Sequence, residues 1–201
     1  MAIIISDIEQ GSPEWFALKA GSVGASNIDK IVTVDGKPSK QRTEFMYQLA
    51  GERITGRCEE TFQSLAMQNG IEREASARVL FEMVIGVDVQ QVGIVFADES
   101  RTVHCSPDGL IGDDEGVEIK NPMMKTHVKY MLNGKLPTEY FSQIQMSLYV
   151  TGRKRWWFMS CYDGLKPLII ECKRDDFFLE CLDRELRAFN ADLEKIVKEI
   201  S

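Results

Sequence analysis

The stretch SPDGLIGDDEGVEIKNP, residues 106–122, is the most informative part of the 201-residue chain. It opens with a Pro-Asp-Gly turn signal, which places Asp108 at a bend. Glu118 and Lys120 then follow two residues apart in a short apolar run. Because successive side chains of a strand point to opposite faces, these two charged groups are predicted to share one face. The residues that alternate with them, Val117 and Ile119, are predicted to face the core.

The residue types on this turn and strand are those that a metal-dependent phosphodiesterase uses. Asp108 and Glu118 offer hard oxygen ligands for Mg²⁺, and Lys120 would sit beside the attacking water or the scissile phosphate. An Asp…Glu-x-Lys pattern nevertheless arises by chance about once per protein of this length. The alternative is an ordinary hairpin with a polar outer face, and the pattern alone does not decide between the two.

The composition is typical of a water-soluble globular protein. The chain is 44% hydrophobic and 27% charged, and we expect residues 1–201 to form a single domain. No run of eighteen apolar residues is present, so no membrane-spanning helix is expected. The N-terminus lacks the pattern of a signal peptide. We therefore expect a cytoplasmic location.

The cysteines and histidines do not indicate a zinc site or a disulfide framework. Five cysteines are widely spaced and odd in number, and no CxxC pair is present. In a cytosolic protein such cysteines are expected to be reduced and mostly buried. The two histidines, His104 and His127, lack the spacing of zinc ligands.

The charge is distributed unevenly along the chain. The net charge is −7, which argues mildly against a nucleic-acid partner. Residues 120–155, however, carry seven basic residues against Glu139 alone. This asymmetry is compatible with one basic face on an acidic body, and a solvated charged surface is an equal alternative.

The hydrophobic periodicity predicts helices, then strands, then helices. Helices are expected over residues 13–20, 26–32, 43–54, 61–85 and 138–150, and the chain is expected to end in a long amphipathic helix with an apolar stripe from Phe178 to Ile200. Strands are expected over residues 91–97, 102–105, 116–120, 155–161 and 168–172, with the last two forming a hairpin. This order predicts an α/β fold with a mixed central sheet flanked by helices.

A metal site would need a further acidic residue from another element. Glu74 is the candidate, because it lies just beside a helical stripe formed by Ala75, Val79 and Met83. Glu72 is the rival, and an ordinary surface glutamate is the alternative for Glu74.

Four blocks of the sequence, in this order, resemble the phage lambda exonuclease and YqaJ-type viral recombinase family. The blocks are EQGSPEWFALKAGSVGAS (9–26), GIEREASARVLFE (70–82), CSPDGL with VEIKNP (105–122) and YFSQIQMSLYVT (140–151). The resemblance implies the restriction-endonuclease-like core of the PD-(D/E)xK nucleases, which agrees with the α/β prediction.

The resemblance also assigns metal and catalytic roles by position. Asp108, Glu118 and the backbone carbonyl of Ile119 would bind one or two Mg²⁺ or Mn²⁺ ions. Glu74 matches the family's helix glutamate, which favours it over Glu72. Lys120 would orient or deprotonate the attacking water, and Gln143 matches the glutamine beside the active site.

A pocket for a 5′-phosphate is implied at Lys19, Ser26 and Ser106. Lys19 stands where lambda exonuclease has arginine, so the charge is kept and the bidentate fork is lost. Ser26 also fits a capping box, and Ser106 also fits the start of a turn. Trp15, Trp156 and Trp157 are interpreted as core or sheet-face residues rather than base-stacking platforms.

The function implied by the resemblance is 5′→3′ hydrolysis of linear double-stranded DNA. The products would be 5′-mononucleotides and 3′ single-stranded overhangs for phage-type recombination. The protein would form a ring-shaped trimer, act with a phage single-strand annealing protein, and work in the cytoplasm of a bacterial host. The alternatives are a structure- or sequence-specific endonuclease of the same fold and a catalytically silent DNA-binding module.

Overall fold

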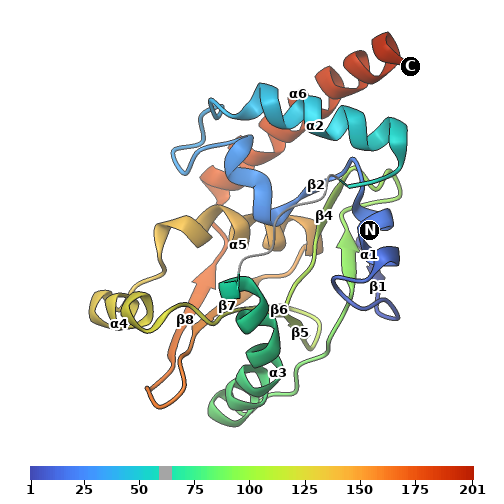
Figure 1. Cartoon of the computed structure of the whole chain (residues 1–201). Helices are drawn as coiled ribbons and strands as arrows, with labels where there is room; N and C mark the ends of the chain where they lie inside the picture. Colours follow the sequence, from blue (N-terminus) through green and yellow to red (C-terminus); the bar gives the residue numbers. More distant parts are fainter. Residues whose placement is uncertain (59–64) are drawn as a thin grey trace.

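The computed structural model describes the backbone of residues 1–58 and 65–201 and the side chains of residues 1–58 and 73–201. Over this part of the chain, the strands form two four-stranded sheets (Figure 1). The first has the order β1(Ile3–Ile5), β3(Ile94–Phe96), β4(Val103–Cys105), β2(Val23–Gly24). The second has the order β5(Gly109–Ile111), β6(Glu115–Lys120), β7(Arg155–Ser160), β8(Leu168–Lys173).

Both sheets are mixed. β2 pairs with β4, and β6 with β7, in parallel, and the other neighbours are antiparallel. The expected α/β class is therefore confirmed, but the strands form two mixed sheets and not the single mixed central sheet that was expected. Residues 106–108 join β4 of the first sheet directly to β5 of the second. The stretch that opens with Ser106 thus crosses from one sheet to the other.

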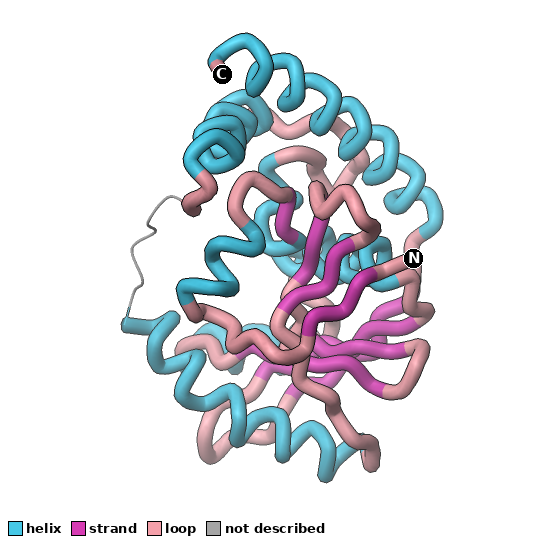
Figure 2. The backbone as a smooth tube through the Cα atoms, turned by 90° about the vertical axis from the view of Figure 1, so that its right-hand side faces the viewer, coloured by secondary structure: helices cyan, strands magenta, loops and turns pink. Residues whose placement is uncertain are grey.

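Helices cover the sheets on several sides, as Figure 2 shows. They are α1(Pro13–Lys19), the 3₁₀ helix η1(Ala25–Lys30), α2(Arg42–Thr55), α3(Leu65–Ile85), α4(Met124–Asn133), α5(Thr138–Thr151) and α6(Asp176–Ile200). α2 and α6 pack against each other, with the rings of Phe45 and Phe189 stacked at 5.9 Å. α5 contributes Ile144, Met146 and Leu148 to the larger hydrophobic core.

Most of the expected elements are confirmed, and the hairpin of β7 and β8 pairs in antiparallel fashion. The first residues of the helix expected at 61–85 lie outside the described part of the chain. The sequence did not predict β1, β2, β5 or α4. α4 buries His127 and Tyr130, while its apolar Val128 and Leu132 are exposed, so apolar spacing did not mark its packed face.

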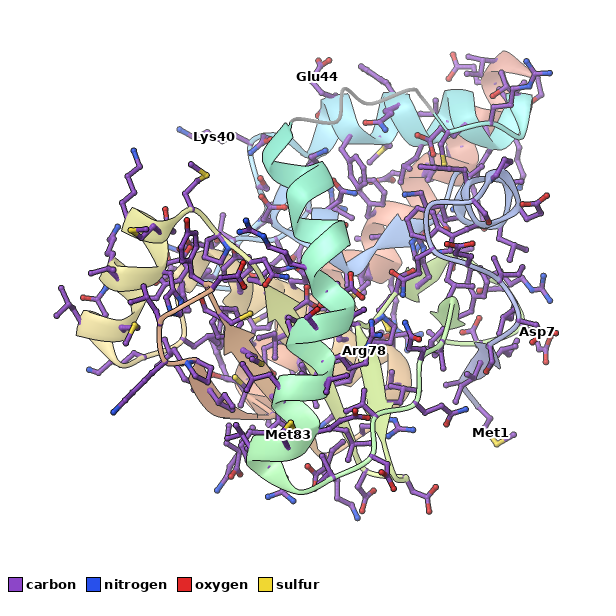
Figure 3. All side chains as sticks on the ribbon, turned by 60° about the horizontal axis from the view of Figure 1, so that its bottom comes forward. Met1, Asp7, Lys40, Glu44, Arg78 and Met83 are labelled. Atoms are coloured by element: carbon purple, nitrogen blue, oxygen red, sulfur yellow. The ribbon has the colours of Figure 1, made fainter. Side chains whose placement is uncertain are left out.

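The apolar stripe expected on α3 is wrong. Val79 is 55% exposed and Met83 78% exposed, and Figure 3 shows α3 at the surface with Met83 near its end. The face that packs on the second sheet carries Ala77 and Phe81, which join Val117 in a separate core cluster. Glu74 precedes these residues at helical spacing and therefore lies on the packed side of α3.

Candidate active site

β6 presents the charged pair as the alternation predicted. Val117 is fully buried and Ile119 is 4% exposed, so both belong to the core. Glu118 and Lys120 form an ion pair on the other face, with side chains 3% and 28% exposed. Gln143 on α5 donates from Nε2 to Oε1 of Glu118 at 2.6 Å. Oε1 of Glu118 is therefore held by both Lys120 and Gln143.

Asp108 lies in the link between the two sheets and faces this pair. Its Oδ2 accepts a hydrogen bond from the backbone N–H of Ile119 at 2.5 Å, which fixes the carboxylate against β6. Burial raises the pKa of Asp108 well above its usual value, and the Glu118 and Glu74 carboxylates raise it further. The ammonium of Lys120 and the Ile119 hydrogen bond oppose this rise only in part. Asp108 is thus a partly buried carboxyl group close to two other carboxylates and to the Lys120 ammonium.

The charge of Lys120 is stabilised by the same neighbours. Burial alone would lower the pKa of its ammonium, but the Glu118 and Asp108 carboxylates outweigh burial and raise the pKa. Its Nζ also lies 5.5 Å from the ring centroid of Tyr140. Lys120 is therefore a cation at neutral pH, next to two carboxylates.

Arg78 joins Glu74 to Asp108, and sequence reasoning missed it. Its Nη2 donates to Oε1 of Glu74 at 2.5 Å, and its Nε donates to the backbone carbonyl of Asp108 at 3.0 Å. The side chain of Arg78 is largely buried. The signal that identifies it is a charged i, i+4 pair on the helix face that also carries Ala77 and Phe81. The side chain of the rival Glu72 lies outside the described residues.

The donor set fits a hard divalent cation in its chemistry. Asp108, Glu118 and Glu74 offer carboxylate oxygens, the ligands that Mg²⁺ and Mn²⁺ prefer. The charges of Glu118 and Glu74 raise the pKa of Asp108. Among the described residues, no group of three or more His, Cys, Asp or Glu is already arranged as a metal cluster. Binding at Glu118 and Glu74 would replace contacts that these groups now make with Lys120 and Arg78.

A cleft of about 800 Å³ connects this acidic cluster to the predicted phosphate site. The N-terminal segment 6–11 and α1 form one wall, and Glu74 and Arg78 of α3 line another. In Figure 3, Arg78 extends from α3 towards the segment that carries Asp7, which lines the same cleft. Lys19 and Asp108 both reach the cleft, so the structure brings a predicted phosphate residue and a predicted metal residue together.

Lys19 and Ser106 meet at Trp15. The Nζ of Lys19 lies 3.8 Å from the centroid of the Trp15 ring. The indole N–H of Trp15 donates to Oγ of Ser106 at 3.0 Å. Burial lowers the pKa of Lys19, and the nearby Cys58 and Glu52 side chains oppose this change. Trp15 is partly buried, which agrees with its interpretation as a packing residue.

Ser26 lies nearby but is not joined to the other two residues. β2 and β4 are parallel with Gly24 opposite His104, so Ser26 and Ser106 each follow by two residues at the same end of the pair. Among the described residues, no hydrogen bond or ion pair connects Ser26 to Lys19 or Ser106. The capping box expected at Ser26 is wrong, because η1 begins after Gly24 without a side-chain cap.

The basic segment does not form one continuous basic face. Lys120, Lys154 and Arg155 are paired with carboxylates. Arg153 is buried and donates to the carbonyls of Ile111, Gly112 and Glu115. The exposed cations of the segment that form no ion pair within the described residues are Lys125, Lys129 and Lys135. No described helix is both long and apolar enough to cross a membrane.

Comparisons with known proteins agree on the fold and the family. An alkaline exonuclease from Laribacter hongkongensis is 33% identical to this chain, with a TM-score of 0.85 over 94% of this chain and 96% of that one. The same exonuclease in complex with dAMP aligns equally well. A phage-related exonuclease from Haemophilus somnus 129PT shares the fold at 13% identity, with a TM-score of 0.67 over 90% and 96% of the two chains.

A search of the curated proteins found no match. The model of the YqaJ-like viral recombinase domain matches residues 14–154, which is most of the chain and includes all the predicted site residues from Lys19 to Gln143. The chain belongs to the family of YqaJ-like viral recombinase domains.

Proposed function

We propose that this protein is a metal-dependent exodeoxyribonuclease that degrades linear duplex DNA from its 5′ ends. It would release 5′-mononucleotides and leave 3′ single-stranded overhangs. The observation that carries the proposal is the cleft in which Lys19 and the Asp108 cluster meet. A phosphomonoester held at Lys19 would lie in the same cleft as the acidic residues that surround the scissile bond. The related exonuclease, which is known in complex with dAMP, supports a mononucleotide product.

Each residue of the cluster has a role in this proposal. Asp108, Glu118, Glu74 and the backbone carbonyl of Ile119 would hold Mg²⁺ or Mn²⁺. The ion would supply a water of lowered pKa and stabilise charge on the leaving 3′-oxygen. Lys120, whose ammonium is stabilised by Glu118 and Asp108, would orient the attacking water.

Two further residues would position these proposed metal ligands. Gln143 would keep the Glu118 carboxylate in place through its hydrogen bond. Arg78 would do the same for Glu74 and for the backbone of Asp108.

The proposed 5′ pocket comprises Lys19, Ser26 and Ser106. Each cleavage leaves a new 5′-phosphate, which this pocket would bind again after the enzyme advances by one nucleotide. By family resemblance, the active form would be a ring-shaped trimer that passes its 3′ overhang to a phage single-strand annealing protein. Sedimentation of the purified protein, alone and with duplex DNA, tests the trimer.

A comparison of four substrates tests the function. Linear duplex with a 5′-phosphate, linear duplex with a 5′-hydroxyl, 3′-phosphorylated duplex and a covalently closed circle are incubated with Mg²⁺ or with EDTA. We expect digestion of the 5′-phosphorylated duplex to be fastest, the circle to stay intact and EDTA to stop all cleavage. Cleavage of the circle would instead support the endonuclease alternative.

Asp108→Asn tests the site itself. We expect a loss of activity on the order of 10³-fold, since several kcal/mol of charge stabilisation are removed. The matched control is Asp113→Asn, which removes an exposed carboxylate from the same hairpin. An Asp108→Asn variant as active as this control would show that the site is assigned wrongly, and a wild-type protein without activity would favour the silent DNA-binding module.

A further inference from the structure

Trp15 contacts Lys19, which lines the cleft, and Ser106, which directly precedes the cleft residues Pro107 and Asp108. Its indole N–H donates to Oγ of Ser106 at 3.0 Å and to the backbone carbonyl of Gly93 at 3.1 Å. The ammonium nitrogen of Lys19 lies over its ring face, 3.8 Å from the ring centroid. The start of α1 holds the residue in place, because the backbone N–H of Trp15 donates to Oγ of the N-cap residue Ser12 at 3.2 Å. One side chain therefore spans the two halves of the proposed phosphate pocket.

The hydrogen bond decides how the Ser106 hydroxyl can act. An indole N–H is a donor only, so the Ser106 oxygen is the acceptor in this contact. The hydroxyl hydrogen of Ser106 is consequently left to donate to another group. An anion in the cleft is a suitable acceptor, and hydrogen bonds to charged groups are the stronger ones. The second bond, to Gly93, keeps the indole edge in this orientation.

The ring face decides where the Lys19 charge lies. A lysine ammonium is a compact point charge on a flexible stem, without the fixed fork of arginine. A cation over the face of tryptophan is attracted by the ring, which restricts the positions available to it. Phe16 adds a second ring at 4.8 Å from the same nitrogen. The aromatic pair thus gives Lys19 an orientation that its own side chain lacks.

We propose that Trp15 is the positioning residue that makes this protein discriminate a 5′-phosphate from a 5′-hydroxyl end. It aims the Ser106 hydroxyl and the Lys19 ammonium at one terminal phosphomonoester. The ring face is occupied by Lys19 and the edge by Ser106 and Gly93, so Trp15 acts through these groups and not by stacking on a base. This inference rests on the proposed exonuclease function.

The test uses the ratio of kcat/KM for 5′-phosphorylated and 5′-hydroxyl duplex in Mg²⁺. Trp15→Phe keeps a ring face and removes the N–H donor. We expect it to lower the ratio by about five- to tenfold, the usual effect of one net hydrogen bond. The loss should fall mainly on the phosphorylated substrate. The matched control is Trp157→Phe, which also removes an indole hydrogen bond, here to Glu115 at 2.6 Å and outside the cleft; its ratio should equal that of the wild type.

Two further variants examine the same coupling through Ser106 and Lys19. Ser106→Ala should lower the ratio, and adding Trp15→Phe to it should lower the ratio less than Trp15→Phe does alone. Lys19→Arg introduces a guanidinium with a fixed fork of donors, so the ratio should become less sensitive to Trp15→Phe. Thermal unfolding of each variant identifies any that fail to fold. If Trp15→Phe does not fold, an unchanged ratio in Ser106→Ala overturns the inference.

The possible failures are distinguishable. A wild-type ratio near one contradicts the 5′-phosphate pocket of the proposed function. A clear wild-type preference that Trp15→Phe leaves unchanged overturns the role of Trp15 and leaves the pocket standing. An equal loss on both substrates also overturns it, because it would show that Trp15 supports the cleft as a whole.

Discussion

At the residue scale, the two cations of the acidic cluster are bound to different carboxylates. Lys120 pairs with Glu118, and Arg78 pairs with Glu74. The Asp108 carboxylate instead accepts the backbone N–H of Ile119. Burial, and then the Glu118 and Glu74 carboxylates, raise the pKa of Asp108. The negative charge of Asp108, a proposed metal ligand, is therefore unfavourable in the metal-free protein.

Because this charge is unfavourable, we predict that Asp108→Asn stabilises the metal-free protein. The amide oxygen can still accept from Ile119, while the buried negative charge is removed. We expect the free energy of unfolding in EDTA to rise by about 0.5–2 kcal/mol, as for strained functional sites in general. Urea unfolding measures it, with the exposed Asp113→Asn as control. Mg²⁺ should stabilise the wild type and leave Asp108→Asn unchanged. A variant less stable than the wild type in EDTA would contradict this account.

His104 is a second residue whose environment has a measurable consequence. Its ring is 6% exposed, and Nδ1 lies 2.7 Å from Oγ of Ser22, which donates to the carbonyl of Lys19. Burial, and then the charge of Lys19, lowers the pKa of His104 to about 3. The unfolded chain binds this proton below pH 6.5 and the folded one does not, so His104 makes the protein less stable as pH falls from 6.5 to about 3.

The contribution is about 1.4 kcal/mol per pH unit within that window. His104→Asn should be less stable at pH 7, because packing is lost. Its free energy of unfolding should then approach that of the wild type as the pH falls towards 4. Urea unfolding at a series of pH values gives the difference between the two proteins, in which the common carboxylates cancel. A difference independent of pH would show that His104 is not buried as a neutral ring.

At the scale of elements, α3 carries a predicted site residue, Glu74, on its packed face, although the apolar stripe used to predict that face was wrong. The apolar stripe of Val79 and Met83 pointed to the wrong face, because it faces outward. Glu74, the predicted residue, nevertheless lies on the packed face with Phe81. The sequence held a second signal, the Glu74–Arg78 spacing, which hydrophobic periodicity does not use. Buried cations on a helix need a partner, so a charged i, i+4 pair near large apolar residues identifies such a face.

Arg78 therefore supports a prediction that concerns α3 as a unit. Arg78→Met removes the bonds to Glu74 and to the Asp108 carbonyl. We expect cleavage of 5′-phosphorylated and 5′-hydroxyl duplex to fall together, by about ten- to a hundredfold, since 1.4–2.7 kcal/mol of positioning is lost. Initial rates on both substrates measure it.

The matched control is Arg73→Met on the same helix. Arg73 is 42% exposed at its side chain and makes a loose ion pair with Asp163 at 3.6 Å. Its loss should leave both rates within about twofold, as expected for a surface pair. Equal losses in the two variants would show that α3 responds to any lost charge.

At the scale of the whole molecule, the link between the sheets explains what the sequence could and could not predict. Strand alternation placed Val117, Glu118 and Lys120 correctly, because it depends only on local geometry. The division into two sheets depends on how β4 continues through residues 106–108 into β5, which is a long-range pairing problem. The three-residue β5 was not predicted, because it directly follows the turn signal of Pro107 and Asp108. Local chemistry was therefore predictable, and the arrangement of the sheets was not.

Charge is the other property that only the whole molecule reveals. The sequence offered seven basic residues over 120–155, yet ion pairs and backbone carbonyls occupy four of them. The remaining lysines, Lys125, Lys129 and Lys135, lie on α4 and the loop that follows it. Asp and Glu are absent from residues 121–138, so this segment is locally positive in an acidic chain. We expect it to supply the phosphate contacts of a bound duplex.

Salt dependence tests this expectation, because each phosphate contact releases counterions. The slope of log K against log salt is about −0.9 per contact on duplex DNA. In the inactive Asp108→Asn background, replacing the three lysines with glutamine should make the slope shallower by about two to three. The control replaces Lys154, Lys173 and Lys195, which carry the same charge but are paired with Asp114, Glu171 and Asp192. Their loss should change the slope by less than about one, because paired cations release fewer counterions on binding. If both sets of substitutions changed the slope equally, net charge and not the position of α4 would govern binding.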